Sequence, residues 1–212
     1  MMPRLLTLCF LLGAPLACTV GEGEGRVVSD NLYVNGCWNG PFDLSPDFFG
    51  ANPDQGDSLA IRVQRGDNIE DVSDGLIVMV TDLQEVRKHI NENIPVGMPR
   101  GVTPSGVPIV LNPNPTKISL ALYLHNTCHQ QNGTIYSVAG FIRFSSLFSG
   151  DINEGSAENR LTDATFDASF ADPRELAEVP ESDVDARAAL TSKVTGNFRF
   201  FFQRGQPSQP FQ

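Results

Sequence analysis

A cysteine and two histidines that lie close together are the residues best suited to chemistry in this sequence. His125, Cys128 and His129 occur in the stretch HNTCH, and Cys37 could join them as a fourth ligand. Thiolate sulfur and imidazole nitrogen are the groups that bind zinc and copper in proteins. In a regular strand, however, His125 and Cys128 would point to opposite faces, and a Cys37–Cys128 disulfide would consume both thiols. We therefore expect this disulfide, flanked by two surface histidines, and neither a metal nor another cofactor.

Acidic side chains crowd two predicted turn regions, where their oxygens could hold calcium. The first region carries Asp67, Glu70, Asp71 and Asp74, and the second spans residues 151–154. Hard cations prefer such oxygen ligands, and the second region starts like an EF-hand loop. Its glycine falls one position early and no glutamate occupies the twelfth position, so that motif fails. Acidic loops on an acidic protein are usually just solvated surface, which is the favoured interpretation. Calcium binding by these residues is the alternative.

The sequence contains none of the common catalytic motifs. It has no Gly-x-Ser-x-Gly elbow, no His-Glu-x-x-His and no glycine-rich phosphate loop. Three histidines and 25 acidic residues permit many imagined triads, so their presence decides nothing. Because function must be argued from a site, the sequence predicts a protein that is not an enzyme. An unrecognised hydrolase or metalloprotein is the less favoured alternative.

The only tryptophan, Trp38, directly follows Cys37. A tryptophan in that position is expected to pack against the disulfide as part of the core. Alternatively, Trp38 and Tyr33 could form a platform on which a sugar ring stacks. This alternative defines a second function class, a carbohydrate- or calcium-dependent binding module.

The N-terminal stretch MMPRLLTLCFLLGAPLAC has the three parts of an export signal. Arg4 supplies positive charge, residues 5–14 form an apolar run, and small residues precede a cleavage point. The run is too short to cross a bilayer, for which about 20 residues are needed. We therefore expect the leader to be removed, and a cut after Ala17 would leave Cys18 as the new N-terminus.

This arrangement resembles the lipobox of bacterial lipoproteins, in which the new N-terminal cysteine carries lipid. An aliphatic and a small residue precede Cys18, although Pro15 stands where the motif usually has leucine. The stretch that follows is polar and glycine-rich, which is typical of a flexible tether. The resemblance implies a signal peptide at residues 1–17, a lipidated cysteine with its tether at 18–25 and a single folded domain at 26–212.

The resemblance also implies a location. Thr19 is not the aspartate that often follows the cysteine of lipoproteins retained at the inner membrane, so attachment to the outer membrane is implied, with the domain facing the periplasm or the cell surface. The formal net charge of −10 makes nucleic acid a poor partner. The predicted function is a structural or interaction domain of the cell envelope, held to the membrane by lipid on Cys18, whose partners are envelope proteins or glycans.

Alternation of apolar and polar residues predicts a mainly β domain. Apolar side chains in residues 117–128 fall on one face of a strand, and residues 76–81 are apolar on both faces, as in a central strand. Seven or eight short strands with one to three short helices favour an antiparallel β-sandwich, and a closed β-barrel is the alternative. The expected strands are 26–34, 58–64, 76–81, 117–128, 134–146, 163–170 and 193–203.

Capping residues and prolines predict where the short helices begin. Asp82 precedes Glu85 by three positions, an N-cap pattern, and Asp172 is followed by proline at the first helical position. A third short helix is expected over residues 182–190. The stretches interpreted as loops are 41–56, 94–115 and 147–161.

Asn132-Gly133 lies between two predicted strands and is a strong hairpin signal. A two-residue turn there would pair Leu122 with Arg143, which places a core side chain opposite a polar one. A one-residue offset removes the conflict, so we expect a longer loop or a bulge with Gly133 at positive φ. The core face of the second strand is expected to carry Tyr136, Val138, Ile142 and Phe144.

Overall fold

The computed structural model describes residues 23–54, 56–66, 70–98, 101–102, 108–109, 116–129 and 133–204. The expected signal peptide, the lipid-acceptor Cys18 and the candidate calcium ligand Asp67 lie outside these residues. None of the helices in the described ranges has the length and apolar character that crossing a bilayer requires.

Ten strands form one continuous sheet. They are β1 (Gly23–Val34), β2 (Trp38–Leu44), β3 (Phe48–Asp54), β4 (Ser58–Arg65), β5 (Asp74–Val80), β6 (Ile94–Gly97), β9 (Ile118–Leu124), β10 (Thr134–Ser146), β11 (Leu161–Ala171) and β12 (Ser192–Phe201). Their order is β2-β1-β12-β11-β10-β6-β9-β5-β4-β3, and neighbours are antiparallel except β6 and β9, which are parallel. Two further short strands, β7 (Gly101–Val102) and β8 (Pro108–Ile109), pair with each other. Because β1 begins at Gly23, the sheet starts inside the stretch predicted as tether.

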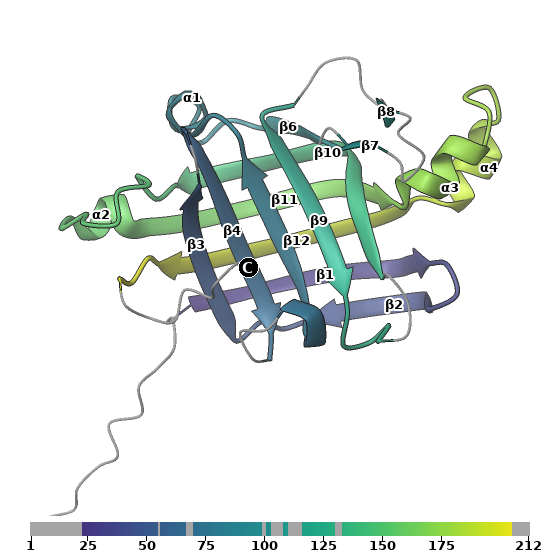
Figure 1. The fold of residues 1–212 in the computed structure, drawn as a ribbon, viewed down its shortest axis with the longest axis horizontal. Coiled ribbons are helices and arrows are strands. Elements are labelled where there is room, and N and C mark those ends of the chain that lie inside the picture. The colour runs from purple at the N-terminus through teal and green to yellow at the C-terminus, as the bar shows by residue number, and fades with distance from the viewer. Residues whose placement is uncertain are drawn as a thin grey trace, which may run out of the picture.

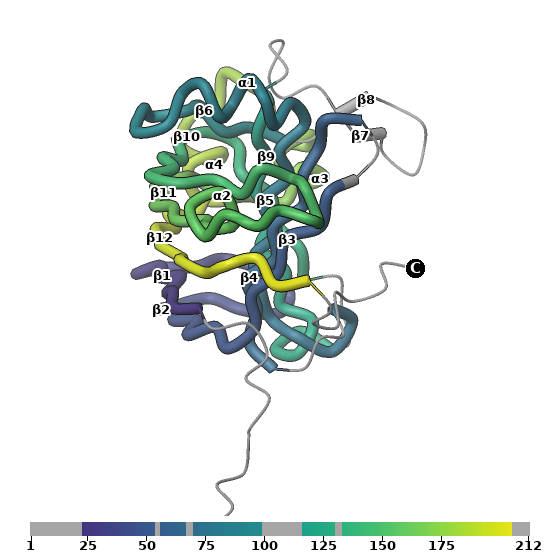
Figure 2. Tube along the Cα trace, turned by 90° about the vertical axis from the view of Figure 1, so that its left-hand side faces the viewer, coloured from purple at the N-terminus to yellow at the C-terminus, as the bar shows by residue number. Residues whose placement is uncertain are grey.

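The sheet curls so strongly that its two halves face each other as a half-barrel. Figure 1 shows β3, β4 and β9 crossing steeply in front of the nearly horizontal β1, β2, β10, β11 and β12, and Figure 2 shows the two layers from the side. The halves are one sheet because β9 pairs directly with β10 and β6 pairs with both. The prediction of a mainly β fold with short helices is confirmed. The β-sandwich is wrong, since a sandwich requires two separate sheets.

The described strands do not form the alternative, a closed barrel, either. β2 and β3 lie at the two ends of the strand order, and no pairing joins them. Phe49 of β3 instead stacks on Phe200 of β12, with ring centroids 5.9 Å apart. Side-chain packing, rather than backbone pairing, therefore covers the core on this side.

The apolar core lies between the two halves of the curled sheet. Ile61 of β4 and Val78 of β5 are fully buried on one side, and Phe170 of β11 and Phe198 of β12 are fully buried on the other. The core residues of β11 and β12 occupy alternate positions, as the period of two in the sequence predicts. The curl thus buries the inner face of both halves in a single core.

β10 changes phase along its length. Ile135 and Ser137 are buried near its start, whereas Ile142 and Phe144 are buried near its end. The change from odd to even positions coincides with a β-bulge directly after Ser137, where the pairing with β11 shifts. The expectation that Ile142 and Phe144 face the core is confirmed, but Tyr136 and its even-numbered neighbour Val138 do not share their face.

The connection between β9 and β10 occupies residues 125–133, so the prediction of a longer loop is confirmed, whereas Gly133 does not have the expected positive φ. Leu122 pairs with Ile135, which places two buried apolar side chains opposite each other. After the bulge in β10, the even-numbered residues face the core in place of the odd-numbered ones. Gly140 follows the bulge with φ of 118°, and an added Cβ there would collide with the Asp167 carbonyl oxygen.

Short helices begin at the predicted caps. The Asp82 carboxylate accepts a hydrogen bond from the Glu85 amide at 3.1 Å, and Asp172 accepts one from the Arg174 amide at 2.9 Å. The described residues contain four α-helices, one more than the upper limit of the prediction, and one 3₁₀ turn. They are α1 (Leu83–Arg87), α2 (Ala157–Arg160), α3 (Pro173–Glu178), α4 (Val184–Ala189) and the turn Glu70–Val72.

The predicted loops contain ordered elements. Residues 41–56 include the end of β2 and all of β3, an edge strand that accommodates Pro53. Residues 94–115 include β6, the strand that pairs with both halves of the sheet. Leu147 and Phe148 are buried at the start of the third predicted loop. Proline, glycine and polar content hid these elements because they dilute the alternating pattern.

Candidate functional site

Cys37 and Cys128 form the expected disulfide, with their Cα atoms 5.6 Å apart. Cys37 lies between β1 and β2 in one half of the sheet, whereas Cys128 lies between β9 and β10, where the halves meet. The bond therefore ties the two loops at one end of the half-barrel. Together with the 91 positions that separate the cysteines in sequence, this makes it a long-range cross-link of the whole domain.

Trp38, which directly follows Cys37 in the chain, packs against the core. It is half-buried against the core and meets Phe42 edge-on, with ring centroids 6.4 Å apart. Its register partner is the buried Val34, so Tyr33, one position earlier in β1, lies on the opposite face of the sheet. The core interpretation of Trp38 is confirmed, and a sugar platform built from Trp38 and Tyr33 is wrong.

His125 uses both ring nitrogens to hold the loop after β9. Its Nδ1 lies 3.0 Å from the Glu70 carbonyl oxygen, and its Nε2 lies 3.1 Å from Thr134 Oγ1. Because a carbonyl only accepts, Nδ1 carries a proton and donates it to Glu70, and Nε2 pairs with the hydroxyl. His125 is thus half-buried, not a surface residue, whereas His129 is exposed. Within the described ranges, no three potential metal-ligating side chains come together.

Asp74 anchors the same loop from β5. Its carboxylate accepts hydrogen bonds from the amides of Asn126 and Thr127, both at 3.0 Å, and from Thr127 Oγ1 at 2.6 Å. The side chain is 8% exposed, so these donors compensate for the loss of water around the charge. Asp74, one of the candidate calcium ligands, therefore has a structural role in holding this loop.

The other candidate calcium ligands point to different partners. Glu70 forms an ion pair with the buried Arg62 of β4, and Asp71 is exposed. In the second acidic region, Asp151 accepts from the Asn153 amide at 2.8 Å, and Glu154 accepts from the amide of Ser156 at 2.9 Å. These are turn-stabilising contacts of the kind that Asp, Asn and Glu make in loops.

Tyr123 adds a buried polar contact that sequence analysis misses. Its hydroxyl donates to Gln64 Oε1 at 2.8 Å, and burial raises the pKa of the phenol. Alternation places Tyr123 on the outer face of β9, yet the side chain is 1% exposed. The period of two identifies the face of a sheet but does not reveal whether that face is covered.

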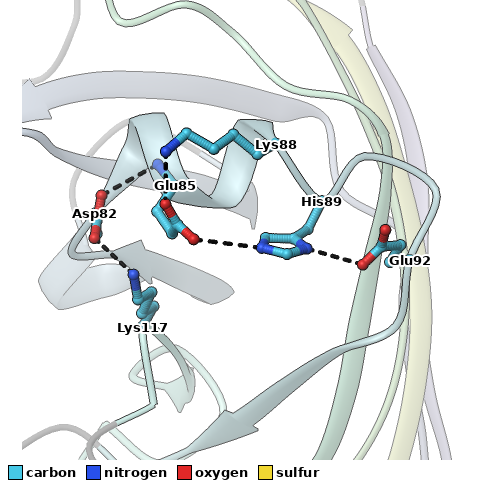
Figure 3. Close-up of polar contacts among 6 residues, drawn as sticks. All are labelled: Asp82, Glu85, Lys88, His89, Glu92 and Lys117. Carbon is cyan, nitrogen blue, oxygen red and sulfur yellow. Dashed lines mark hydrogen bonds and ion pairs between the residues drawn. The ribbon is translucent and has the colours of Figure 1, made fainter.

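A charged cluster at α1 is the second feature that no sequence motif indicates (Figure 3). Apart from Lys117, its members lie three or four positions apart, a spacing that brings side chains together on a helix and could have revealed them. Glu85 forms a 2.8 Å ion pair with Lys88, and His89 lies 3.5 Å from Glu85 and 2.8 Å from Glu92. The cluster comprises Asp82, Glu85, Lys88, His89, Glu92 and Lys117.

The contacts in this cluster set the direction of its pKa shifts. A hydrogen bond from Lys117 is the main reason that the pKa of Asp82 is lowered, and one from Lys88 does the same for Glu85. Hydrogen bonding to Glu92, and then to Glu85, raises the pKa of His89 above 6.5. All of these side chains are substantially exposed, so the arrangement stabilises a short helix and offers no enclosed space for a substrate.

Comparisons with protein-family models, with curated proteins and with solved structures find no match to this chain. The class of protein is therefore defined by architecture alone. It is a mainly β domain, built from one curled sheet and cross-linked by a disulfide.

Proposed function

We propose that the protein is an exported, lipid-anchored component of a cell envelope whose domain acts by binding and not by catalysis. The observation that carries the proposal is the Cys37–Cys128 disulfide. Disulfides of this kind form and persist in oxidising compartments outside the cytosol, so the bond is consistent with an extracytoplasmic location. The N-terminal sequence up to Cys18, with its lipobox-like end, supports export and lipid attachment.

The proposed non-catalytic role is supported by the tasks of the side chains that looked most chemical. His125, Asp74 and Glu70 hold loops at one end of the half-barrel through hydrogen bonds and an ion pair. Each of these side chains thus has a structural contact within the protein. Their arrangement therefore favours a stable scaffold that presents a surface.

The short distance between Cys18 and β1 gives the proposal a geometric consequence. Only residues 19–22 separate the cysteine from Gly23, where β1 begins. Even a fully extended chain of this length spans roughly 18 Å. Lipid on Cys18 would consequently hold the sheet close to the membrane surface, where envelope proteins and glycans are its neighbours.

The proposal is tested by intact-mass analysis of the full chain purified from bacterial membranes. Wild-type protein should begin at Cys18 and carry the mass of acyl chains, and Cys18→Ser should lose that mass and leave the membrane fraction. Cys9→Ser, within the leader, is the matched control and should keep both properties. An unmodified leader still attached to wild-type protein, or free thiols at Cys37 and Cys128, would refute the proposal.

A further inference from the structure

The segment that would carry the lipid enters the domain at one end of the half-barrel. β1 begins at Gly23, which lies opposite Phe200 of β12. A Cβ on Gly23 would collide with the Phe49 ring, so the start of β1 is packed tightly against the core. Because only residues 19–22 separate this fixed point from Cys18, lipid on Cys18 would hold this end of the domain near the bilayer.

Two apolar side chains lie on the outer face of the sheet at this same end. Phe201, the last residue of β12, and Leu161, the first residue of β11, are register partners. Their neighbours Phe200 and Thr162 are buried, so Phe201 and Leu161 point outward, where Phe201 is exposed and Leu161 is half-buried. The outer face of the sheet therefore ends in an apolar pair beside the point where β1 starts.

The connection between β10 and α2 adds a third apolar side chain, Ile152, which is exposed. Its neighbour Asn153 accepts a hydrogen bond from Arg204, which follows β12. Phe148, at the start of the connection, stacks on Phe202 with ring centroids 4.1 Å apart. These contacts hold the connection against the end of β12. Figure 1 shows α2, the arrowhead of β12 and the start of β1 at the same left-hand end, with α3 and α4 at the other.

A row of charged side chains lies two positions further along the strands. Asp163, Arg199 and Glu24 are neighbours across β11, β12 and β1. Apolar side chains can enter the boundary between headgroups and acyl chains, whereas charged ones remain at the level of water and headgroups. With two carboxylates and one guanidinium, the row does not attract anionic headgroups, so lipids without net charge suit it better.

We propose that this end of the domain rests on a bilayer of zwitterionic lipids, with Phe201, Leu161 and Ile152 in the interfacial layer. The inference rests on the proposed lipid on Cys18. Three side chains bury too little apolar area to bind a membrane from solution. A short tether, however, supplies an effective concentration on the order of 1 mM, at which a weak contact is populated. The lipid thus fixes the orientation of the domain as well as its location, and α3 and α4 are held away from the membrane.

The test is methyl NMR of the full chain, purified from bacterial membranes and placed in phosphatidylcholine nanodiscs that contain a nitroxide-labelled lipid. Intact mass is measured first, so that the lipid on Cys18 is established separately from the contact. The nitroxide should enhance relaxation of the Leu161 and Ile152 methyl groups at least about tenfold more than that of Val184, because the length of β12, about 30 Å, separates the two ends. Val184 is 70% exposed on α4, so its own exposure to solvent does not protect it.

Two exposed phenylalanines provide a matched pair of variants. Phe201→Ser should lower the enhancement at Leu161 and Ile152 at least about twofold, because apolar area is lost from the contact. Phe141→Ser makes the same change at a ring of similar exposure on β10, opposite Asp167 and away from this end, and should leave the enhancement unchanged.

The outcomes separate this inference from the proposed function. In protein whose mass shows the acyl chains, no enhancement, equal enhancement at Val184, or equal effects of the two variants would overturn the orientation and leave the lipid anchor intact. A mass without acyl chains would refute the proposed function, and the inference would fall with it.

Discussion

Phe49 stacks on Phe200 across the side of the half-barrel where the sheet does not close. Their ring centroids are 5.9 Å apart, and both side chains are buried. Phe49 belongs to the edge strand β3 and Phe200 to β12, and these strands share no backbone pairing. The contact thus joins the two halves of the sheet at a place where hydrogen bonds do not.

Removing one ring of this pair should be costly. Phe200→Ala should lower the free energy of unfolding by about 3–5 kcal/mol, because it deletes a buried aromatic ring and leaves a cavity between the halves. Phe201→Ala, one position later, removes a ring that is 39% exposed and should cost less than about 1 kcal/mol. Urea denaturation followed by fluorescence of Trp38 measures both, and equal losses would contradict this account of how the half-barrel is held together.

Gly140 should be irreplaceable in β10. Its φ of 118° is unfavourable for other residues, and a Cβ would collide with the backbone of Asp167 and Ala168 in β11. We expect Gly140→Ala to destabilise the domain by at least about 2 kcal/mol. Gly155→Ala is the control, since a Cβ there has open space and the position has no positive φ. A thermal melt in which both variants behave alike would show that the close approach of β10 and β11 is not required.

The disulfide should supply a large share of the domain's stability. It closes a loop between positions 91 apart, which removes about 4–5 kcal/mol of conformational freedom from the unfolded chain in the entropic model. The double variant Cys37→Ser/Cys128→Ser should therefore unfold at markedly lower urea concentration than the oxidised protein. Reductant should lower the midpoint of wild type and leave that of the double variant unchanged, and a midpoint of wild type that is insensitive to reductant would refute the prediction.

Much of the sheet could be predicted from local pattern. The alternation of Leu59, Ile61 and Val63 identified β4 and its core face, although Arg62 and Gln64 on the opposite face are buried as well. Asp82 and Asp172 predicted two helix starts, since the capping contact is made within a few residues. Alternation and capping involve residues that are close in sequence, so these elements can be recognised from the sequence alone.

The curl of the sheet depends on long-range pairings that local sequence patterns do not reveal. β6 joins the halves through only a few paired residues in a stretch whose prolines and glycines suggest a loop. The inner face of a half-barrel has the same alternation as that of a sandwich, so the pattern cannot separate them.

His89 gives the molecule a measurable dependence on pH. Its side chain contacts Glu92 and Glu85, and the hydrogen bond to Glu92 is the larger cause of its raised pKa. The unfolded chain has the ordinary pKa of about 6.5. A group whose pKa is higher in the folded state stabilises that state fully below the unfolded pKa, and this contribution is lost as pH rises through the folded pKa.

We therefore expect the ring-proton signals of His89 to titrate above pH 6.5 and to move back toward that value in Glu92→Gln. Glu158→Gln removes an exposed carboxylate on α2, outside the charged cluster at α1, and should leave the titration unchanged. The thermal midpoint of wild type should exceed that of His89→Gln below pH 6.5, and the difference should shrink at higher pH. A difference that is constant with pH, or that grows as pH rises, would mean that the contacts of His89 with Glu85 and Glu92 do not persist in solution.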